Sequence, residues 1–129
     1  ISFEGVNWQD DRELLDENKP KVLSTMEMGE ETVKAYKEGM YMVTQMDANG
    51  WYGTAYSTFK DYPIKIAAKT GTAEMDGDRA SNAMFAGFTL DEAYPFAFIV
   101  CVEGGGYGRA TCVPIASKVL VACKEALEG

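Results

Sequence analysis

Four consecutive residues near the middle of the chain, Lys69, Thr70, Gly71 and Thr72, have side chains suited to binding an anion. The lysine ammonium and the two threonine hydroxyl groups can hold a carboxylate. The glycine lets a substrate backbone approach, and the amides of a strand edge can donate to a developing oxyanion. This composition is unusual for a strand that only packs. The four residues alone are equally compatible with a plain solvated strand.

The overall composition restricts the chemistry further. The 129 residues contain no histidine, which excludes His-based acid–base catalysis, the Ser-His-Asp triad and His-containing zinc sites. A net charge of −8 would repel phosphate backbones, so nucleic acid is not an expected partner. Cys101, Cys112 and Cys123 are expected to be buried apolar filler. No metal or other cofactor is expected.

The four residues lie on the first of three predicted strands. Apolar patterning and turn residues predict strands over residues 64–74, 82–89 and 95–103, which short links join into an antiparallel meander. The third strand is apolar at nearly every position and is therefore expected to be buried on both faces. At the amino end we expect a strand over residues 1–6, a surface loop over 7–20 and an extended segment over 21–28.

Two helices are expected to pack on this meander. The first covers residues 30–46, with acidic residues in its first turn and Asn49-Gly50 after its end. The second begins near Pro114, because proline suits a first helical turn. Its predicted apolar face consists of Ile115, Val119, Ala122, Cys123 and Ala126. The sequence thus predicts one α+β unit over residues 1–129, an antiparallel β-meander packed by helices.

The sequence around these four residues resembles the carboxy-terminal part of penicillin-binding protein transpeptidase domains, especially class B. The resemblance rests on IAAKTGTAE at 66–74, NAMFAGF at 82–88 and PFAFIVCVE at 95–103, and on a G-T-A segment at 53–55. K-T-G is one of the signatures of these serine acyltransferases. The chain departs from the pattern at Ala68, where many members have Gly, and at Met84, where many have Trp.

The resemblance implies roles for the four residues. Lys69 would support proton movement and bind the substrate carboxylate, which the hydroxyl groups of Thr70 and Thr72 would also contact. The backbone N–H of Thr72 would donate to the oxyanion, and Gly71 would leave room for the acyl donor. The implied activity is D,D-transpeptidation of peptidoglycan stem peptides ending in D-Ala-D-Ala, with β-lactams as suicide analogues. The implied location is the extracytoplasmic face of the bacterial cell membrane, with an amino-terminal helix as anchor.

The nucleophile of such an enzyme is not evident in these residues. In the family a serine in S-x-x-K and a second S-x-N motif lie well upstream of K-T-G, and the chain has no S-x-N. Ser57 and Lys60 fit S-x-x-K by letter, but they lie too close to Lys69 for the intervening helical subdomain. The chain also starts at Ile1 and opens on strand-like residues. We therefore expect an incomplete transpeptidase domain, inactive alone, with its nucleophile upstream.

Two other functions stay open at this stage. A non-catalytic sensor or binding module would use Lys69, Thr70 and Thr72 to bind a stem peptide or β-lactam without turnover. A β-lactamase is the lesser option, because no residue that would activate a deacylating water is evident. The third strand would lack a neighbour, and its apolar edge is predicted either to form a homodimer or to pair with residues 1–6.

Overall fold

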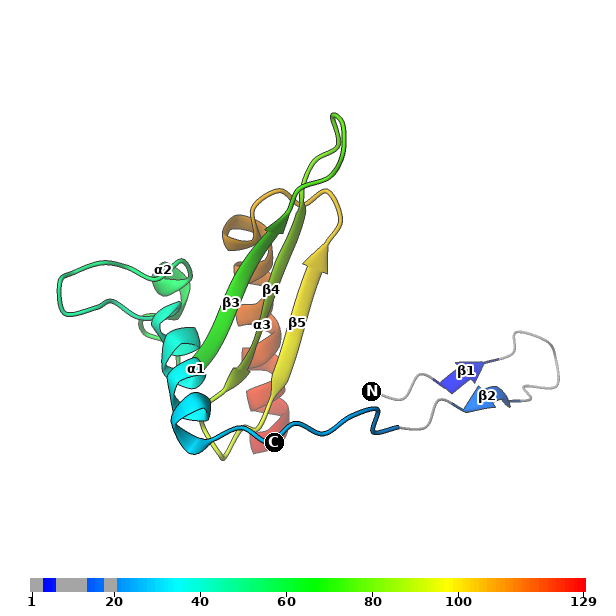
Figure 1. The fold of residues 1–129 in the computed structure, drawn as a ribbon, viewed down its shortest axis with the longest axis horizontal. Coiled ribbons are helices and arrows are strands. Elements are labelled where there is room, and N and C mark those ends of the chain that lie inside the picture. Colours follow the sequence, from blue (N-terminus) through cyan, green and yellow to red (C-terminus); the bar gives the residue numbers. More distant parts are fainter. Residues whose placement is uncertain (1–3, 7–13, 18–20) are drawn as a thin grey trace.

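A computed structural model describes residues 4–6, 14–17 and 21–129 of the protein. The helices and strands are β1 (Glu4–Val6), β2 (Leu14–Glu17), α1 (Glu30–Met42), α2 (Tyr56–Phe59), β3 (Ile66–Ala73), β4 (Asn82–Thr89), β5 (Ala97–Val102) and α3 (Gly108–Glu128). The strands form a two-stranded sheet, β1–β2, and a three-stranded sheet of order β3–β4–β5 (Figure 1). The predicted α+β fold class, an antiparallel meander packed by helices, is confirmed.

The meander is antiparallel throughout. β3 pairs with β4 from Ile66↔Thr89 to Ala73↔Asn82. On its other side, β4 pairs with β5, also antiparallel. The β4 boundaries are those predicted, and β3 and β5 are shorter than predicted by one or two residues at each end. At the tip of the β3–β4 hairpin Gly77 has a positive φ of 72°, which glycine adopts without steric cost.

Helix α3 covers one face of the sheet and contacts all three strands, as expected. Between helix and sheet lies the hydrophobic core, centred on Phe85 of β4, which is fully buried. Its buried members are Ala55, Phe59, Ile64, Ile66, Ala68, Ala83, Phe85, Cys112, Val113, Ala116 and Leu120. Burying a side chain of this size is worth about 1.5–3 kcal/mol, so this face holds α3 firmly against β3 and β4.

The start and the buried face of α3 differ from the prediction. The helix begins at Gly108, so Pro114 lies inside it rather than in its first turn. Both Pro114 and Ala110 are exposed, so water can bond the carbonyl that a proline leaves without its helical donor. The buried face consists of Gly108, Cys112, Val113, Ala116 and Leu120. Ile115 and Val119, which were expected to be buried, are 41% and 51% exposed.

Of the remaining residues predicted for that buried face, Cys123 is half-buried, and Ala122 and Ala126 are exposed.

No helix in the described ranges combines the length and the apolarity that crossing a membrane requires.

Helix α1 ends four residues earlier than predicted. After Met42 the backbone N–H groups bond three residues back, and Met46 then pairs with Tyr52 in an isolated antiparallel bridge. The carboxylate of Asp47 accepts hydrogen bonds from the backbone N–H groups of Asn49 and Trp51. A local turn, which the Asp side chain stabilises, therefore replaces the last predicted helical turn.

The amino-terminal predictions are partly wrong. Leu14–Glu17 is a strand inside the predicted loop, and it pairs with β1. Residues 21–28 form no strand. Because Glu4–Val6 pair with β2, these residues do not cap the free edge of β5. Residues 1–3, 7–13 and 18–20, which complete the predicted segments, lie outside the described residues.

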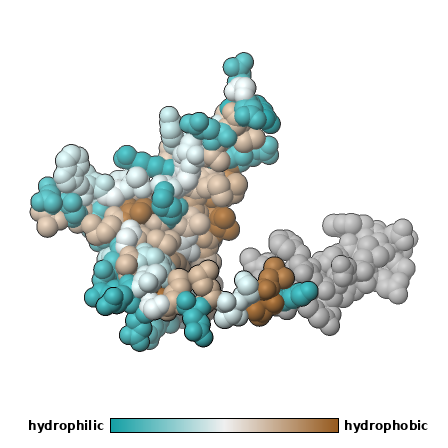
Figure 2. All heavy atoms as spheres, viewed as in Figure 1, coloured by the Kyte–Doolittle hydropathy of each residue, from teal (hydrophilic) through white to brown (hydrophobic). Residues whose placement is uncertain are grey.

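The prediction that the third strand is buried on both faces is also wrong. Exposure alternates along β5, with Ile99 66% exposed and Cys101 exposed, while Phe98 and Val100 are half-buried against the core. α3 lies over one face only, and α1 lies against β3 on the other. Figure 2 accordingly shows apolar colours over β4 and β5 on the face turned to the viewer. Cys101 is therefore not buried filler, whereas Cys112 is.

Candidate active site

The outer edge of β3 is where the backbone of the K-T-G-T residues is free to bind a ligand. The Ile66 carbonyl accepts a hydrogen bond of 2.8 Å from the Thr44 hydroxyl, which comes from outside the sheet. In an antiparallel strand the N–H and C=O of one residue point to the same side, and this side alternates along the chain. Counting from Ile66, the backbone groups of Thr70 and Thr72 also point outward. The Thr72 amide therefore has the orientation that an oxyanion donor needs.

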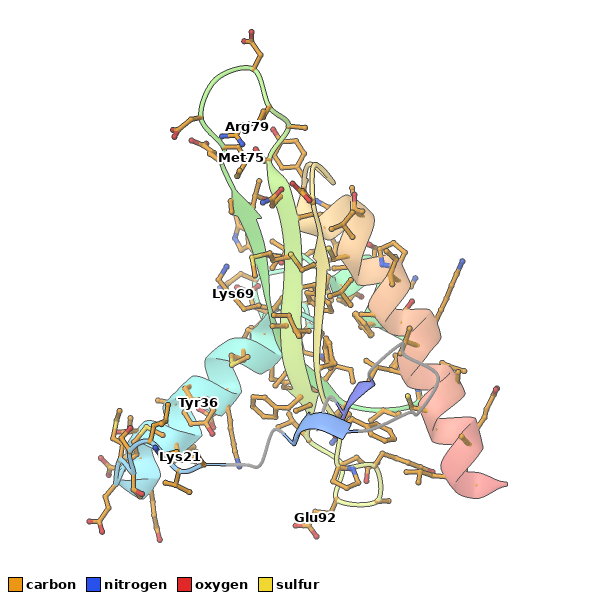
Figure 3. The ribbon with its side chains drawn as sticks, turned by 90° about the vertical axis from the view of Figure 1, so that its right-hand side faces the viewer. Lys21, Tyr36, Lys69, Met75, Arg79 and Glu92 are labelled. Atoms are coloured by element: carbon orange, nitrogen blue, oxygen red, sulfur yellow. The ribbon has the colours of Figure 1, made fainter. Side chains whose placement is uncertain are left out.

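Lys69 lies on the face of the sheet opposite α3. Its side chain is exposed and projects on the side of the sheet where α1 lies (Figure 3). Its register partner on β4 is Ala86, which pairs in turn with Ile99 of β5, so the sheet face beside Lys69 is apolar. The Lys69 Nζ donates a hydrogen bond of 2.6 Å to the Thr70 carbonyl, at the free edge. The charge is thus held next to the outward-facing backbone.

The two threonines lie on the other face of β3, since successive side chains alternate. The Thr70 Oγ1 lies 3.2 Å from the Thr54 Oγ1, within hydrogen-bond distance. Thr72 is exposed and lies farther along the same face. A ligand that touches Lys69 and both threonines must therefore lie at the edge of β3, between the two faces. There it would also meet the Thr72 amide.

Gly71 and Gly108 allow close packing between the site strand and its neighbours. A Cβ on Gly71 would lie 3.2 Å from the Cβ of Met84, its register partner. A Cβ on Gly108 would lie 2.3 Å from the Met84 carbonyl oxygen and 2.5 Å from that of Gly71, far inside ordinary contact. The first turn of α3 therefore rests directly on the backbone of the site strand, and only glycine permits this approach.

A short segment beside β3 completes the surroundings of the site. It contains Thr54 and helix α2, and Tyr62 fastens its end to α3 by donating a hydrogen bond to the Ser117 carbonyl. Burial raises the pKa of Tyr62 to about 12. Ser57 and Lys60, which match S-x-x-K by letter, line a pocket between this segment and the start of α3. The K-T-G-T residues do not line that pocket.

The structure thus places the predicted site residues around one free strand edge. It also brings two residues to their vicinity that sequence reasoning did not assign to a site. Thr54 was identified only as part of a G-T-A segment, and its contact with Thr70 depends on the path of the chain between them. Arg109 lies in the first turn of α3, and a cation directly after a glycine-rich bend was the one available signal.

A comparison with protein-family models matches the penicillin-binding protein transpeptidase domain over residues 6–121. No curated protein and no solved structure matches the chain significantly. The match covers most of the chain, including the strand edge described above and the helix that supports it. The chain belongs to the penicillin-binding protein transpeptidase domain family.

Proposed function

We propose that the chain is part of a class B-like peptidoglycan D,D-transpeptidase and provides the side of its active site that binds the substrate carboxylate and the oxyanion. The observation that carries this proposal is the free edge of β3. This edge has the ammonium of Lys69 on one face, the hydroxyl of Thr70 on the other face and the outward-facing amide of Thr72 along the strand between them. Family membership supports a penicillin-binding transpeptidase function in general terms. The location outside the cytoplasmic membrane belongs to the same proposal.

In the proposed reaction the chain's own residues bind and polarise the peptide. Lys69, Thr70 and Thr72 hold the terminal carboxylate of a D-Ala-D-Ala peptide. The Thr72 amide donates to the oxygen of the scissile carbonyl as it becomes an oxyanion. A serine outside these residues attacks the carbonyl carbon, and collapse of the tetrahedral intermediate expels D-alanine, whose nitrogen takes up the serine proton. An amine of a neighbouring peptide then attacks the ester carbonyl, the new amide bond forms as the ester C–O bond breaks, and the serine oxygen takes up the proton that the amine loses.

The position of the nucleophile is tested by intact mass spectrometry of the 129-residue chain after incubation with a reactive penicillin. We expect no added mass, because the chain contains the carboxylate and oxyanion groups without the family's paired serine motifs. The control is the Ser57→Ala variant, which removes the serine of the sequence that matches S-x-x-K. A stoichiometric adduct that this variant abolishes would place the nucleophile in α2 and contradict the proposal.

Peptide binding by the same chain is a separate test that needs no turnover. Amide chemical shifts are followed while acetyl-Ala-D-Ala-D-Ala, or the same peptide with a carboxamide end, is added. We expect shifts at Thr70 and Thr72 with the free carboxylate, and binding weaker by about tenfold with the carboxamide, because hydrogen bonds to charged groups are the stronger ones. Lys69→Gln should remove this difference, and Lys118→Gln on the exposed side of α3 should keep it. Equal binding of both peptides would contradict the assigned carboxylate site.

A non-catalytic binding module is the second candidate, because the chain carries binding groups and no S-x-N triplet. Such a module would pass the peptide test equally well. Acylation of the whole gene product by a penicillin separates the two functions. A covalent adduct on a serine outside these residues supports the transpeptidase, and peptide binding without any adduct supports the module.

A further inference from the structure

A cleft lies beside the K-T-G-T edge, between the α2 segment and the first turn of α3. One part of it has a volume of about 480 Å³. The adjoining part has a volume of about 570 Å³ and shares Thr54, Ser57 and Arg109 with the first. Because the Thr54 hydroxyl lies 3.2 Å from that of Thr70, the cleft is connected with the site strand through one hydroxyl contact. Pockets of this size are large enough to bind a small ligand or a peptide side chain.

The charge of this cleft is opposite to that of the chain as a whole. Lys60 and Arg109 line it, and among the described residues no acidic side chain does so, whereas the net charge of the chain is −8. Lys60 has one acidic neighbour, Asp61, at 3.8 Å outside the lining. The planar guanidinium of arginine binds a carboxylate through two parallel hydrogen bonds. The cleft is therefore suited to a carboxylate.

Aromatic rings form the other wall of the same cleft. Trp51 and Tyr52 are 77% and 68% exposed, although large aromatic side chains usually pack. The rings of Tyr52 and Tyr56 stack with their centroids 4.9 Å apart, which fixes a flat apolar surface next to the two cations. A ligand that fits both walls carries a carboxylate on a short apolar stem. An acidic amino-acid side chain meets this description.

We propose that this cleft binds a second carboxylate of the peptide substrate, on a residue that precedes the terminal D-Ala-D-Ala. This inference rests on the proposed function. Lys69, Thr70 and Thr72 take the terminal carboxylate at the edge of β3, and Thr54 lies where the peptide passes into the cleft. A peptide is favoured over a neutral sugar because a sugar would use the aromatic wall alone and leave Arg109 and Lys60 without a partner.

The experiment compares two peptides by the fluorescence of Trp51. The chain has one other tryptophan, Trp8, so a Trp8→Phe background leaves Trp51 as the reporter. Acetyl-Glu-Ala-D-Ala-D-Ala and acetyl-Gln-Ala-D-Ala-D-Ala differ only in the side-chain carboxylate. We expect the Glu peptide to bind about tenfold tighter, since hydrogen bonds to charged groups are the stronger ones. Arg109→Gln should abolish this preference, while Arg79→Gln, at the hairpin tip, should keep it (Figure 3).

Each other outcome decides a different point. A preference for the Glu peptide that survives Arg109→Gln would overturn the proposed role of the cleft. If neither peptide binds but acetylglutamate quenches Trp51 only when Arg109 is present, the proposed function fails and the anion-binding cleft stands. If an N-acetylglucosamine oligomer quenches Trp51 in both backgrounds and the two peptides bind equally, the cleft binds sugars and the peptide proposal is wrong.

Discussion

Replacing Gly108 with alanine tests whether α3 sets the position of the K-T-G-T strand. The new Cβ would lie 2.3 Å from the Met84 carbonyl oxygen, whereas ordinary contact begins near 3.4 Å. The first turn of α3 and the backbone of β3 and β4 must therefore separate by about 1 Å in a close-packed region. Overpacking of this kind costs about 1–3 kcal/mol, and the better helix propensity of alanine returns up to about 1 kcal/mol. We expect a net loss of about 1–2 kcal/mol of unfolding free energy.

Thermal unfolding followed by circular dichroism, together with peptide titration, measures the consequences. For a domain of this size the loss corresponds to a Tm lower by about 4–8 °C. The affinity for acetyl-Ala-D-Ala-D-Ala should fall about tenfold, because small displacements of positioning groups weaken the contacts that depend on them. Gly39→Ala is the matched control, since nothing lies within 4 Å of a Cβ at that exposed helical position. This control should raise the Tm by a few degrees. A Gly108→Ala variant with unchanged Tm and peptide affinity would refute the role assigned to α3.

Three further predictions concern other parts of the structure. Because burial raises the pKa of Tyr62 to about 12, its phenol stays protonated in the folded state after the unfolded chain has lost its proton. The free energy of unfolding should thus fall between pH 10 and 12 by about 1 kcal/mol after allowance for solvent screening, and urea titrations of Tyr62→Phe should show a smaller fall. Thr44→Val removes the hydroxyl that bonds the Ile66 carbonyl and should cost about 1–3 kcal/mol in the same assay; an unchanged midpoint would contradict this. If the free edge of β5 forms a homodimer, Ile99→Lys should convert it to a monomer in sedimentation, and a wild-type monomer would reject the dimer.

The meander could be predicted because its signals are local. Asn82–Thr89 is bounded by turn residues and rich in residues that favour strands, so its limits were found without knowledge of the fold. The start of α3 was missed because Pro114 was taken as a first-turn residue, although the helix has already begun at Gly108. With the start displaced, the residues predicted to face the sheet were also wrong: Ile115 was expected to be buried and is exposed. The open face of β5 was missed because an apolar run does not reveal which faces are covered.

The candidate site shows the same division between local and non-local information. Lys69, Thr70 and Thr72 are neighbours in sequence, so one motif was enough to predict them as a site. The outward direction of the Thr72 amide follows from the bond between Thr44 and the Ile66 carbonyl, which joins residues 22 positions apart. The approach of Arg109 to Thr54 likewise depends on how α3 crosses the sheet. No pattern within a short window of sequence contains these two relations.

The placement of Lys69 also limits where the proposed serine can come from. Its ammonium lies on the face opposite α3, while the core fills the other face between helix and sheet. A serine that attacks a carbonyl held at the Thr72 amide, and that exchanges a proton near Lys69, must therefore approach over the face bearing Ala86 and Ile99. That face is apolar, and α1 covers it beside β3 and at the end of β4, where Tyr36 packs edge-on against Phe88. The residues that carry the nucleophile would bury this exposed apolar surface as they bring the serine to the edge of β3. Burial of the surface would therefore be coupled to assembly of the active site.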